Sequence, residues 1–154
     1  MGAPLGREGR RIQARVTLVG RDYVDRVIDA DGQLDEAAVR DAIVHVSARA
    51  AADAETFEPP VSVPDEEMAM AYLRSGAGQA IGLYIQVRTG GRRYPFAPDE
   101  FERLEGAMNT WFELYAACYG VELTSEVSLR TAAQALIDTD NIRDVARIVT
   151  GVPE

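Results

Sequence analysis

The strongest constraint on the fold is a row of large apolar side chains in the stretch from Pro98 to Gly120. Over about five turns the row repeats at spacings of three and four residues, which places it along one face of an α-helix. Pro98 and the two acids after it suit a first helical turn, and Gly120 suits the position just beyond a last one. The sequence therefore predicts an amphipathic helix that packs against the rest of the fold. The apolar row consists of Phe101, Leu104, Met108, Trp111, Tyr115 and Cys118.

This helix has a wider apolar side than contact with one sheet face requires. Phe112 and Tyr119 form a second row beside the first, and tyrosine and tryptophan are favoured at protein interfaces. Exposed apolar surface of this kind often marks an interaction site. We therefore expect the protein to form homo-oligomers through part of this helix. The predicted interface residues are Phe101, Met108, Trp111, Phe112, Tyr115 and Tyr119.

Four further helices follow from similar signals. The first, at about residues 34–56, has apolar residues at spacings of three and four and acids at its start. A loop with three prolines then precedes a short helix at 65–73. Two short helices, at 128–137 and 141–150, close the chain.

Two stretches alternate between apolar and polar residues in the manner of half-buried strands. Residues 12–18 alternate first, and residues 23–29 are predicted to return beside them. Residues 81–87 alternate in the same way, and Gly90-Gly91 then turns the chain into residues 92–96. The sequence thus predicts two β-hairpins.

Together these elements predict an α+β fold, in which a small antiparallel sheet made of two hairpins is covered by four or five helices. At 154 residues the chain is long enough for one domain with its own core. We assign this single domain to residues 12–154. Residues 1–11, rich in glycine and arginine, are predicted to be a mobile basic arm.

The composition indicates the kind of cell from which the protein comes. The chain contains no lysine: all 16 basic residues are arginine, against 25 acids, and the net charge is −9. A bias this complete reflects a whole proteome, because a GC-rich genome favours arginine codons and a salt-adapted cell favours an acidic surface. We expect a haloarchaeal source first and a high-GC bacterium second.

The arginines are concentrated in two segments. Residues 1–21 hold five arginines and one acid, and residues 68–98 hold four arginines and no acid. Both segments contain predicted strands, so one sheet face would gather them. Because arginine binds phosphate and carboxylate through paired hydrogen bonds, this face could take an anionic ligand, an acidic partner segment or nucleic acid. The alternative is that the arginines pair with the chain's own carboxylates. The predicted anion-binding residues are Arg15, Tyr84, Arg88, Arg92 and Arg93.

No group of residues predicts catalysis, a metal site or a cofactor. His45 is the only histidine and lies in a predicted helix, and Cys118, the only cysteine, lies in the apolar row. The glycines of Gly76–Gly82 depart from the dinucleotide-binding pattern and precede a predicted strand instead of following one. The acidic stretch at 29–35 lacks the first and last ligands of a calcium loop.

These observations favour a non-enzymatic accessory or regulatory protein that acts through contacts with a protein partner and forms homo-oligomers. An anion-binding protein that uses the arginine-bearing face is the alternative, and a small enzyme of unknown class ranks third. Nucleic acid ranks below a protein partner. No apolar run approaches the about 18 residues that span a membrane, and no signal peptide opens the chain. We therefore expect a cytoplasmic protein that does not contact membranes.

Overall fold

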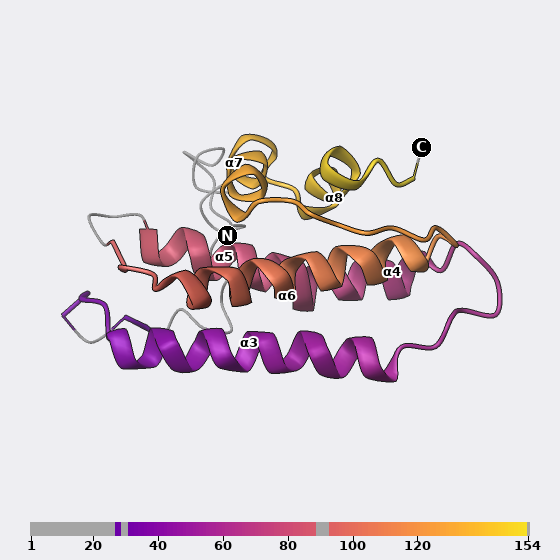
Figure 1. Cartoon of the computed structure of the whole chain (residues 1–154). Helices are drawn as coiled ribbons and strands as arrows, with labels where there is room; N and C mark the ends of the chain where they lie inside the picture. Colours follow the sequence, from indigo (N-terminus) through magenta and orange to yellow (C-terminus); the bar gives the residue numbers. More distant parts are fainter. Residues whose placement is uncertain (1–26, 29–30, 89–92, 154) are drawn as a thin grey trace, which may run out of the picture.

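The structure, a computed structural model, describes residues 27–28, 31–88 and 93–153, and its elements are helices (Figure 1). In this part of the chain the only β-contact is an isolated antiparallel bridge between Ile28 and Leu34. A π-helical turn, η1, joins α4 to α5, so that the three form one continuous helical run. In chain order the elements are α3 (Glu36–Thr56), α4 (Glu66–Tyr72), η1 (Leu73–Ala77), α5 (Gly78–Arg88), α6 (Pro98–Ala117), α7 (Leu129–Thr139) and α8 (Ile142–Thr150).

The predicted α+β fold is wrong, because the described residues form helices and no sheet. The segment predicted as a strand, residues 81–87, is the second half of α5. Its alternation misleads because Gly82 and Tyr84, which lie between the large aliphatic residues, are buried as well. The segment is therefore apolar on nearly every side, which suits a helix enclosed by other helices. Periodicity alone does not separate such a segment from a buried strand.

The other predicted hairpin lies almost entirely outside the described residues, and so does the predicted mobile arm at 1–11. Of the strand predicted at 23–29, only Val27 and Ile28 are described. Val27 is fully buried, and its carbonyl accepts a 2.8 Å hydrogen bond from the N–H of Asp35. This short segment therefore packs against the start of α3.

The helices form three layers in the view of Figure 1. α3 lies at the bottom, α6 and the run from α4 to α5 form the middle layer, and α7 and α8 cover the top. The chain runs along α3, returns along α4, η1 and α5, and crosses the molecule again along α6. Residues 118–128 then lead back to α7. The five predicted helices are confirmed, with bounds that differ by a few residues.

The helix starts follow from local capping signals in the sequence. At the start of α6, the carboxylate of Glu100 accepts a 3.0 Å hydrogen bond from the N–H of Ala97. At four other helices, a polar side chain just before the first turn accepts hydrogen bonds from backbone N–H groups that would otherwise lack partners. These capping residues are Asp35 for α3, Asp65 for α4, Ser128 for α7 and Asn141 for α8.

The core is built around α5 and α6. Nine of the 11 residues of α5 are buried, so that this helix is enclosed by the others. No helix in the described part of the chain is both long and apolar enough to cross a bilayer. Along α6 and its end, the predicted apolar row faces inward, and five of its six side chains have 0% exposure. These five are Leu104, Met108, Trp111, Tyr115 and Cys118.

Candidate functional site

The structure brings three of the five predicted anion-binding residues together. Tyr84 and Arg88 lie one turn apart near the end of α5, and Arg93 follows in the segment that precedes α6. The N–H of Tyr94 donates a 2.9 Å hydrogen bond to the carbonyl of Val87, which holds Arg93 beside the end of α5. We call Tyr84, Arg88 and Arg93 the arginine end.

These residues meet at a helix end and not on a sheet face, which corrects the predicted arrangement. Residues four apart lie on the same side of an α-helix. Tyr84 and Arg88 therefore share a face of α5, as they would have shared one face of a strand. The other two predicted residues, Arg15 and Arg92, lie outside the described part of the chain.

An aromatic cluster lies beneath the arginine end. The ring of Tyr84 lies 5.8 Å from that of Phe96 and 6.1 Å from that of Phe101, measured between centroids. The guanidinium carbon of Arg88 lies 5.9 Å from the centroid of the Tyr84 ring, within the range of a cation–π contact. Tyr84 is buried, whereas Arg88 and Arg93 are exposed. The guanidinium groups of Arg88 and Arg93 are therefore exposed to solvent above an aromatic cluster.

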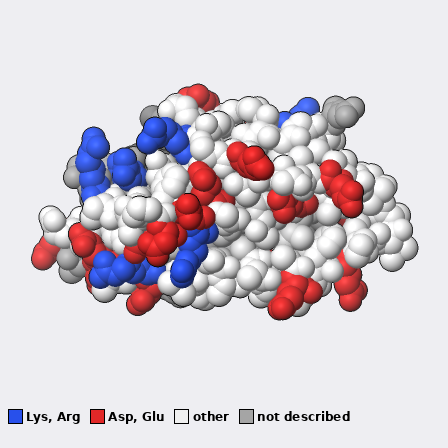
Figure 2. All heavy atoms as spheres, in the orientation of Figure 1, with Lys and Arg blue, Asp and Glu red and all other residues white. Residues whose placement is uncertain are grey.

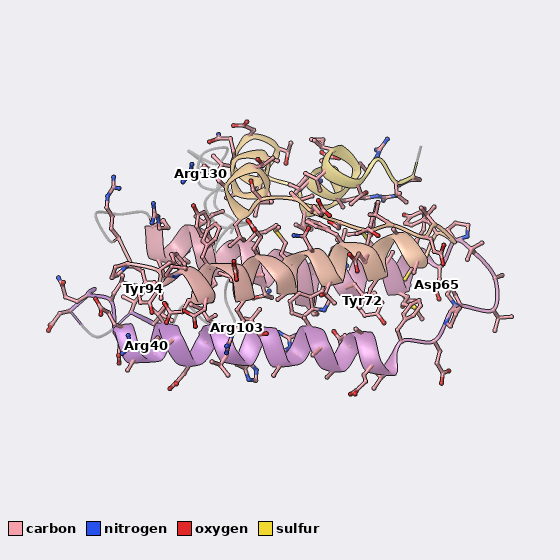
Figure 3. All side chains as sticks on the ribbon, viewed as in Figure 1. Arg40, Asp65, Tyr72, Tyr94, Arg103 and Arg130 are labelled. Carbon is pink, nitrogen blue, oxygen red and sulfur yellow. The ribbon has the colours of Figure 1, made fainter. Side chains whose placement is uncertain are left out.

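Tyr94 anchors the segment that carries Arg93. Its side chain is buried, and its hydroxyl lies 3.0 Å from each carboxylate oxygen of Glu100 in the first turn of α6. Burial and the bond to Glu100 raise the pKa of Tyr94, and Arg40 on α3 opposes this shift. Tyr94 and Arg40 lie at the same end of the molecule, on facing elements (Figure 3). The hydroxyl of Tyr94 thus stays protonated and acts as a donor to α6.

The arginine end carries charge that the described part of the chain does not neutralise. Within the described residues, no carboxylate lies within ion-pair distance of Arg88 or Arg93. One ion pair between described residues joins Arg143 to Glu66 at 3.5 Å, away from the arginine end. On the face shown in Figure 2, basic side chains gather mainly toward the end of the molecule where α5 stops. The negative end of the α5 dipole favours Arg88 in its last turn, but it does not account for Arg93.

The predicted oligomer interface is largely buried inside one copy of the chain. Only Phe101 and Tyr119, of its six residues, keep partial exposure. The cause is that α6 is packed against α3 on one side and against α4 and η1 on another. A second copy therefore has little access to this face of α6. The four side chains with 0% exposure are Met108, Trp111, Phe112 and Tyr115.

Trp111 is held by two residues of α3 that the sequence analysis did not single out. Its indole N–H donates a 2.8 Å hydrogen bond to Oδ2 of Asp53, and the guanidinium of Arg49 lies 5.7 Å from the centroid of its ring. Arg49 also donates a hydrogen bond to the backbone carbonyl of Ser75 in η1. The only signal in the sequence is the four-residue spacing of Arg49 and Asp53, which places both on one face of α3 but does not reveal Trp111 as their partner.

A groove of about 350 Å³ lies between α6 and the segment that leads to α7. Two of its glutamates already cap backbone groups, since Glu105 accepts a hydrogen bond from the N–H of Leu129 and Glu113 accepts one from Ser125. Among the described residues, no three His, Cys, Asp or Glu side chains are placed to hold a metal ion. The groove is lined by Glu102, Glu105, Gly106, Asn109, Thr110, Glu113, Ser125 and Glu126.

The only cysteine and the only histidine do not form a catalytic pair. Cys118 is fully buried, and burial, with a smaller contribution from the charge of Asp65, raises the pKa of its thiol to about 11. A thiol with so high a pKa is a poor nucleophile near neutral pH. His45 lies on the exposed side of α3.

Comparison with known proteins identifies one family. Its model, described as a domain of unknown function (DUF8055), matches residues 37–154. This range contains the arginine end and the contacts of Trp111, whereas residues 1–36 lie outside it. No curated protein and no solved structure matches the chain.

Proposed function

The chain belongs to the DUF8055 family, and we propose that it is a non-enzymatic accessory protein that binds an acidic segment of a partner protein at the arginine end. The observation that carries the proposal is the state of Arg88 and Arg93. The backbone bond between Tyr94 and Val87 joins the two segments that carry them, and both are exposed and, within the described residues, without a carboxylate partner. Each guanidinium can bind one carboxylate through two parallel hydrogen bonds, so that the pair suits neighbouring acidic side chains.

The surroundings of the two arginines favour a protein segment over a small anion. Both guanidinium groups belong to exposed residues, so that an extended segment can reach them from solvent. Phe96 and Phe101 stay partly exposed beside Tyr84, and arginine next to aromatic side chains is typical of protein interfaces. Nucleic acid is disfavoured because a net charge of −9 repels a long phosphate backbone.

The proposal is tested by the affinity for a fluorescein-labelled oligoglutamate peptide, measured by fluorescence anisotropy. Replacing both Arg88→Ala and Arg93→Ala should weaken binding by at least about tenfold, since one charge-assisted hydrogen bond contributes about 1.5–3 kcal/mol. The melting temperature should stay within a few degrees, because an exposed charge contributes only about 0–1 kcal/mol to folding.

Arg103→Ala provides a matched control, because Arg103 is an exposed arginine on α6 outside the arginine end. It should leave the affinity within about twofold of the parent, which is less than 0.5 kcal/mol. Inorganic phosphate and a single-stranded oligonucleotide serve as competitors. The proposal fails if the double variant binds the peptide as well as the parent does, or if the oligonucleotide binds more tightly than the peptide at the same site.

Homo-oligomerisation, a cytoplasmic location and a salt-adapted source remain parts of the proposal. The acidic composition supports the last of these, because carboxylates keep a protein soluble where salt screens its charges. Self-association would have to use side chains other than the four that α6 buries. Light scattering over a hundredfold dilution tests it, and a constant monomer mass of 16.8 kDa would remove it from the proposal.

A further inference from the structure

The helical run from α4 to α5, whose last residue is Arg88, contains one irregularity, the π-turn η1. The N–H of Leu73 bonds to the carbonyl of Ala69, four residues earlier, as in a regular α-helix. The N–H of Gly78 instead bonds to the carbonyl of Leu73, five residues earlier. A π-turn thus holds one residue more than the α-helical turn it replaces. Because one residue corresponds to a rotation of about 100°, the turn changes which side of α5 faces α6.

The sequence of α5 does not fix its own rotation. Nine of its 11 residues are buried, from Gly78 to Ile85 and Val87, and all of these except Gln79 are small or apolar. An amphipathic helix is oriented by its apolar stripe, but a helix that is apolar all round has no such stripe. Another feature must therefore determine which way Tyr84 and Arg88 point.

Side chains support the backbone of the π-turn where its pattern departs from that of an α-helix. Nε2 of Gln79 donates a 3.0 Å hydrogen bond to the carbonyl of Arg74, and Arg49 of α3 donates one to the carbonyl of Ser75. Two successive carbonyls of the turn thus receive side-chain donors. Each such donor stabilises the turn, because an intramolecular hydrogen bond contributes about 0.5–1.5 kcal/mol.

Trp111 of α6 fixes the same turn from the other side. A Cβ atom on Gly76 would lie 2.5 Å from the ring of Trp111, so that only glycine lets η1 approach the ring this closely. The ring is itself held by Asp53 and lies under the guanidinium of Arg49. The π-turn therefore contacts α3 through Arg49 and α6 through Trp111.

We infer that the π-turn sets the rotation of α5, and that Arg49, Asp53 and Trp111 are positioning residues for the arginine end. The π-turn and Arg88 are separated along the helix by 13 residues, counted from Ser75, or about 20 Å. If the turn became α-helical without losing a residue, α5 would turn by about 100° and Arg88 would leave the side on which Arg93 lies. The value of this positioning for binding rests on the proposed function, but the positioning itself does not.

Deletion of Ser75 tests the inference most directly, because it removes the extra residue of the turn. The run should become a regular α-helix with α4 and α5 in their present orientation. We expect a melting temperature within about 4 °C of that of the parent. Nuclear Overhauser effects between the rings of Tyr84 and Phe96, now 5.8 Å apart, should persist. Binding of the oligoglutamate peptide should change by less than about twofold.

Deletion of Ala71 is the matched control, since Ala71 is exposed, lies one turn earlier and belongs to regular α-helix. It should lower the melting temperature by more than about 10 °C, because absorbing the loss at the π-turn would shift the residues in between by one position, and Leu73 among them is fully buried. Equal losses for the two deletions, or loss of the Tyr84–Phe96 signals in a folded Ser75 deletion, would overturn the inference.

A double-mutant cycle tests the role of Arg49. Arg49→Ala should clearly lower the melting temperature of the parent. In the Ser75 deletion the same substitution should cost less than half as much, because the Ser75 carbonyl to which Arg49 donates is no longer present. Equal losses in the two backgrounds would reduce Arg49 to a general packing role and would contradict its assignment as a positioning residue. Both readouts are independent of ligand, so failure of the oligoglutamate peptide to bind would count against the proposed function alone.

Discussion

The indole N–H of Trp111 donates a 2.8 Å hydrogen bond to Oδ2 of Asp53, and this bond joins α6 to α3 across 58 residues of sequence. The indole is fully buried, so no water can replace the carboxylate without a change in packing. The bond also fixes the ring against which Gly76 packs. The contact therefore links α3, α6 and the run from α4 to α5, the three longest helical segments among the described residues.

Asp53→Ala should destabilise the protein, because it leaves the buried N–H of Trp111 without an acceptor. We expect a loss of about 1–3 kcal/mol in the free energy of unfolding, measured by urea denaturation. Asp53→Asn keeps an acceptor oxygen and should cost less. Asp41→Ala, which removes an exposed acid from the same helix, should stay within about 0.5 kcal/mol of the parent. If Asp41→Ala costs as much as Asp53→Ala, the hydrogen bond to Trp111 is not the cause.

Two helical glycines should respond in opposite directions to alanine. Gly76→Ala should destabilise the protein, because the added Cβ would lie 2.5 Å from the Trp111 ring. Gly106→Ala should stabilise it by about 0.5–1 kcal/mol, because alanine is the better helix former and a Cβ there meets no atom within 4 Å. Thermal unfolding of the two variants measures the difference. A rise in melting temperature for Gly76→Ala would contradict the described packing of η1.

The thiol of Cys118 should react slowly with Ellman's reagent at pH 8 in the folded protein and rapidly in urea. Burial raises its pKa from 9.0 to about 11, so that the native state keeps its proton after the unfolded chain has lost it. Stability should therefore fall as the pH rises from about 9 to about 11, because the unfolded state then binds fewer protons. Cys118→Ala should reduce this slope, whatever its effect on stability at neutral pH. A slope that is the same in both proteins would show that other groups cause it.

The melting temperature should rise steeply from low salt to molar potassium chloride. The chain carries 25 acids against 16 arginines, and repulsion among the excess carboxylates weakens when salt screens them. Differential scanning calorimetry at fixed pH provides the measurement. A melting temperature that stays flat or falls over this range would leave genomic base composition as the explanation for the missing lysine.

Local signals were enough to predict the described helices other than η1 and α5. The row at Phe101, Leu104, Met108, Trp111 and Tyr115 predicts α6 because part of that helix stays exposed and polar, so that the spacing of its buried residues is visible in the sequence. Capping residues such as Ser128 and Asn141 mark helix starts, because their side chains bond to backbone groups only a few residues away. Each of these signals depends on neighbours in the chain.

The helix at α5 could not be predicted in the same way, because burial on all sides removes the periodic signal. The sequence did indicate that Tyr84, Arg88 and Arg93 belong together, since they lie in a stretch without acids, but it assigned them to the wrong kind of element. The contacts of Trp111 could not be predicted either, because the four-residue spacing of Arg49 and Asp53 does not identify Trp111 or Gly76 as their neighbours. They bring together residues from three separate segments.

The sequence by itself thus determined where most helices begin and end, which side of α6 is apolar and where positive charge is concentrated. All of these depend on residues within a few turns of one another. Only the tertiary structure decided that residues 81–87 are helical, that α6 is buried by its own chain, and how α5 is rotated. These outcomes depend on which segments enclose each helix, because the free energy of burying an apolar side chain does not distinguish one enclosing neighbour from another.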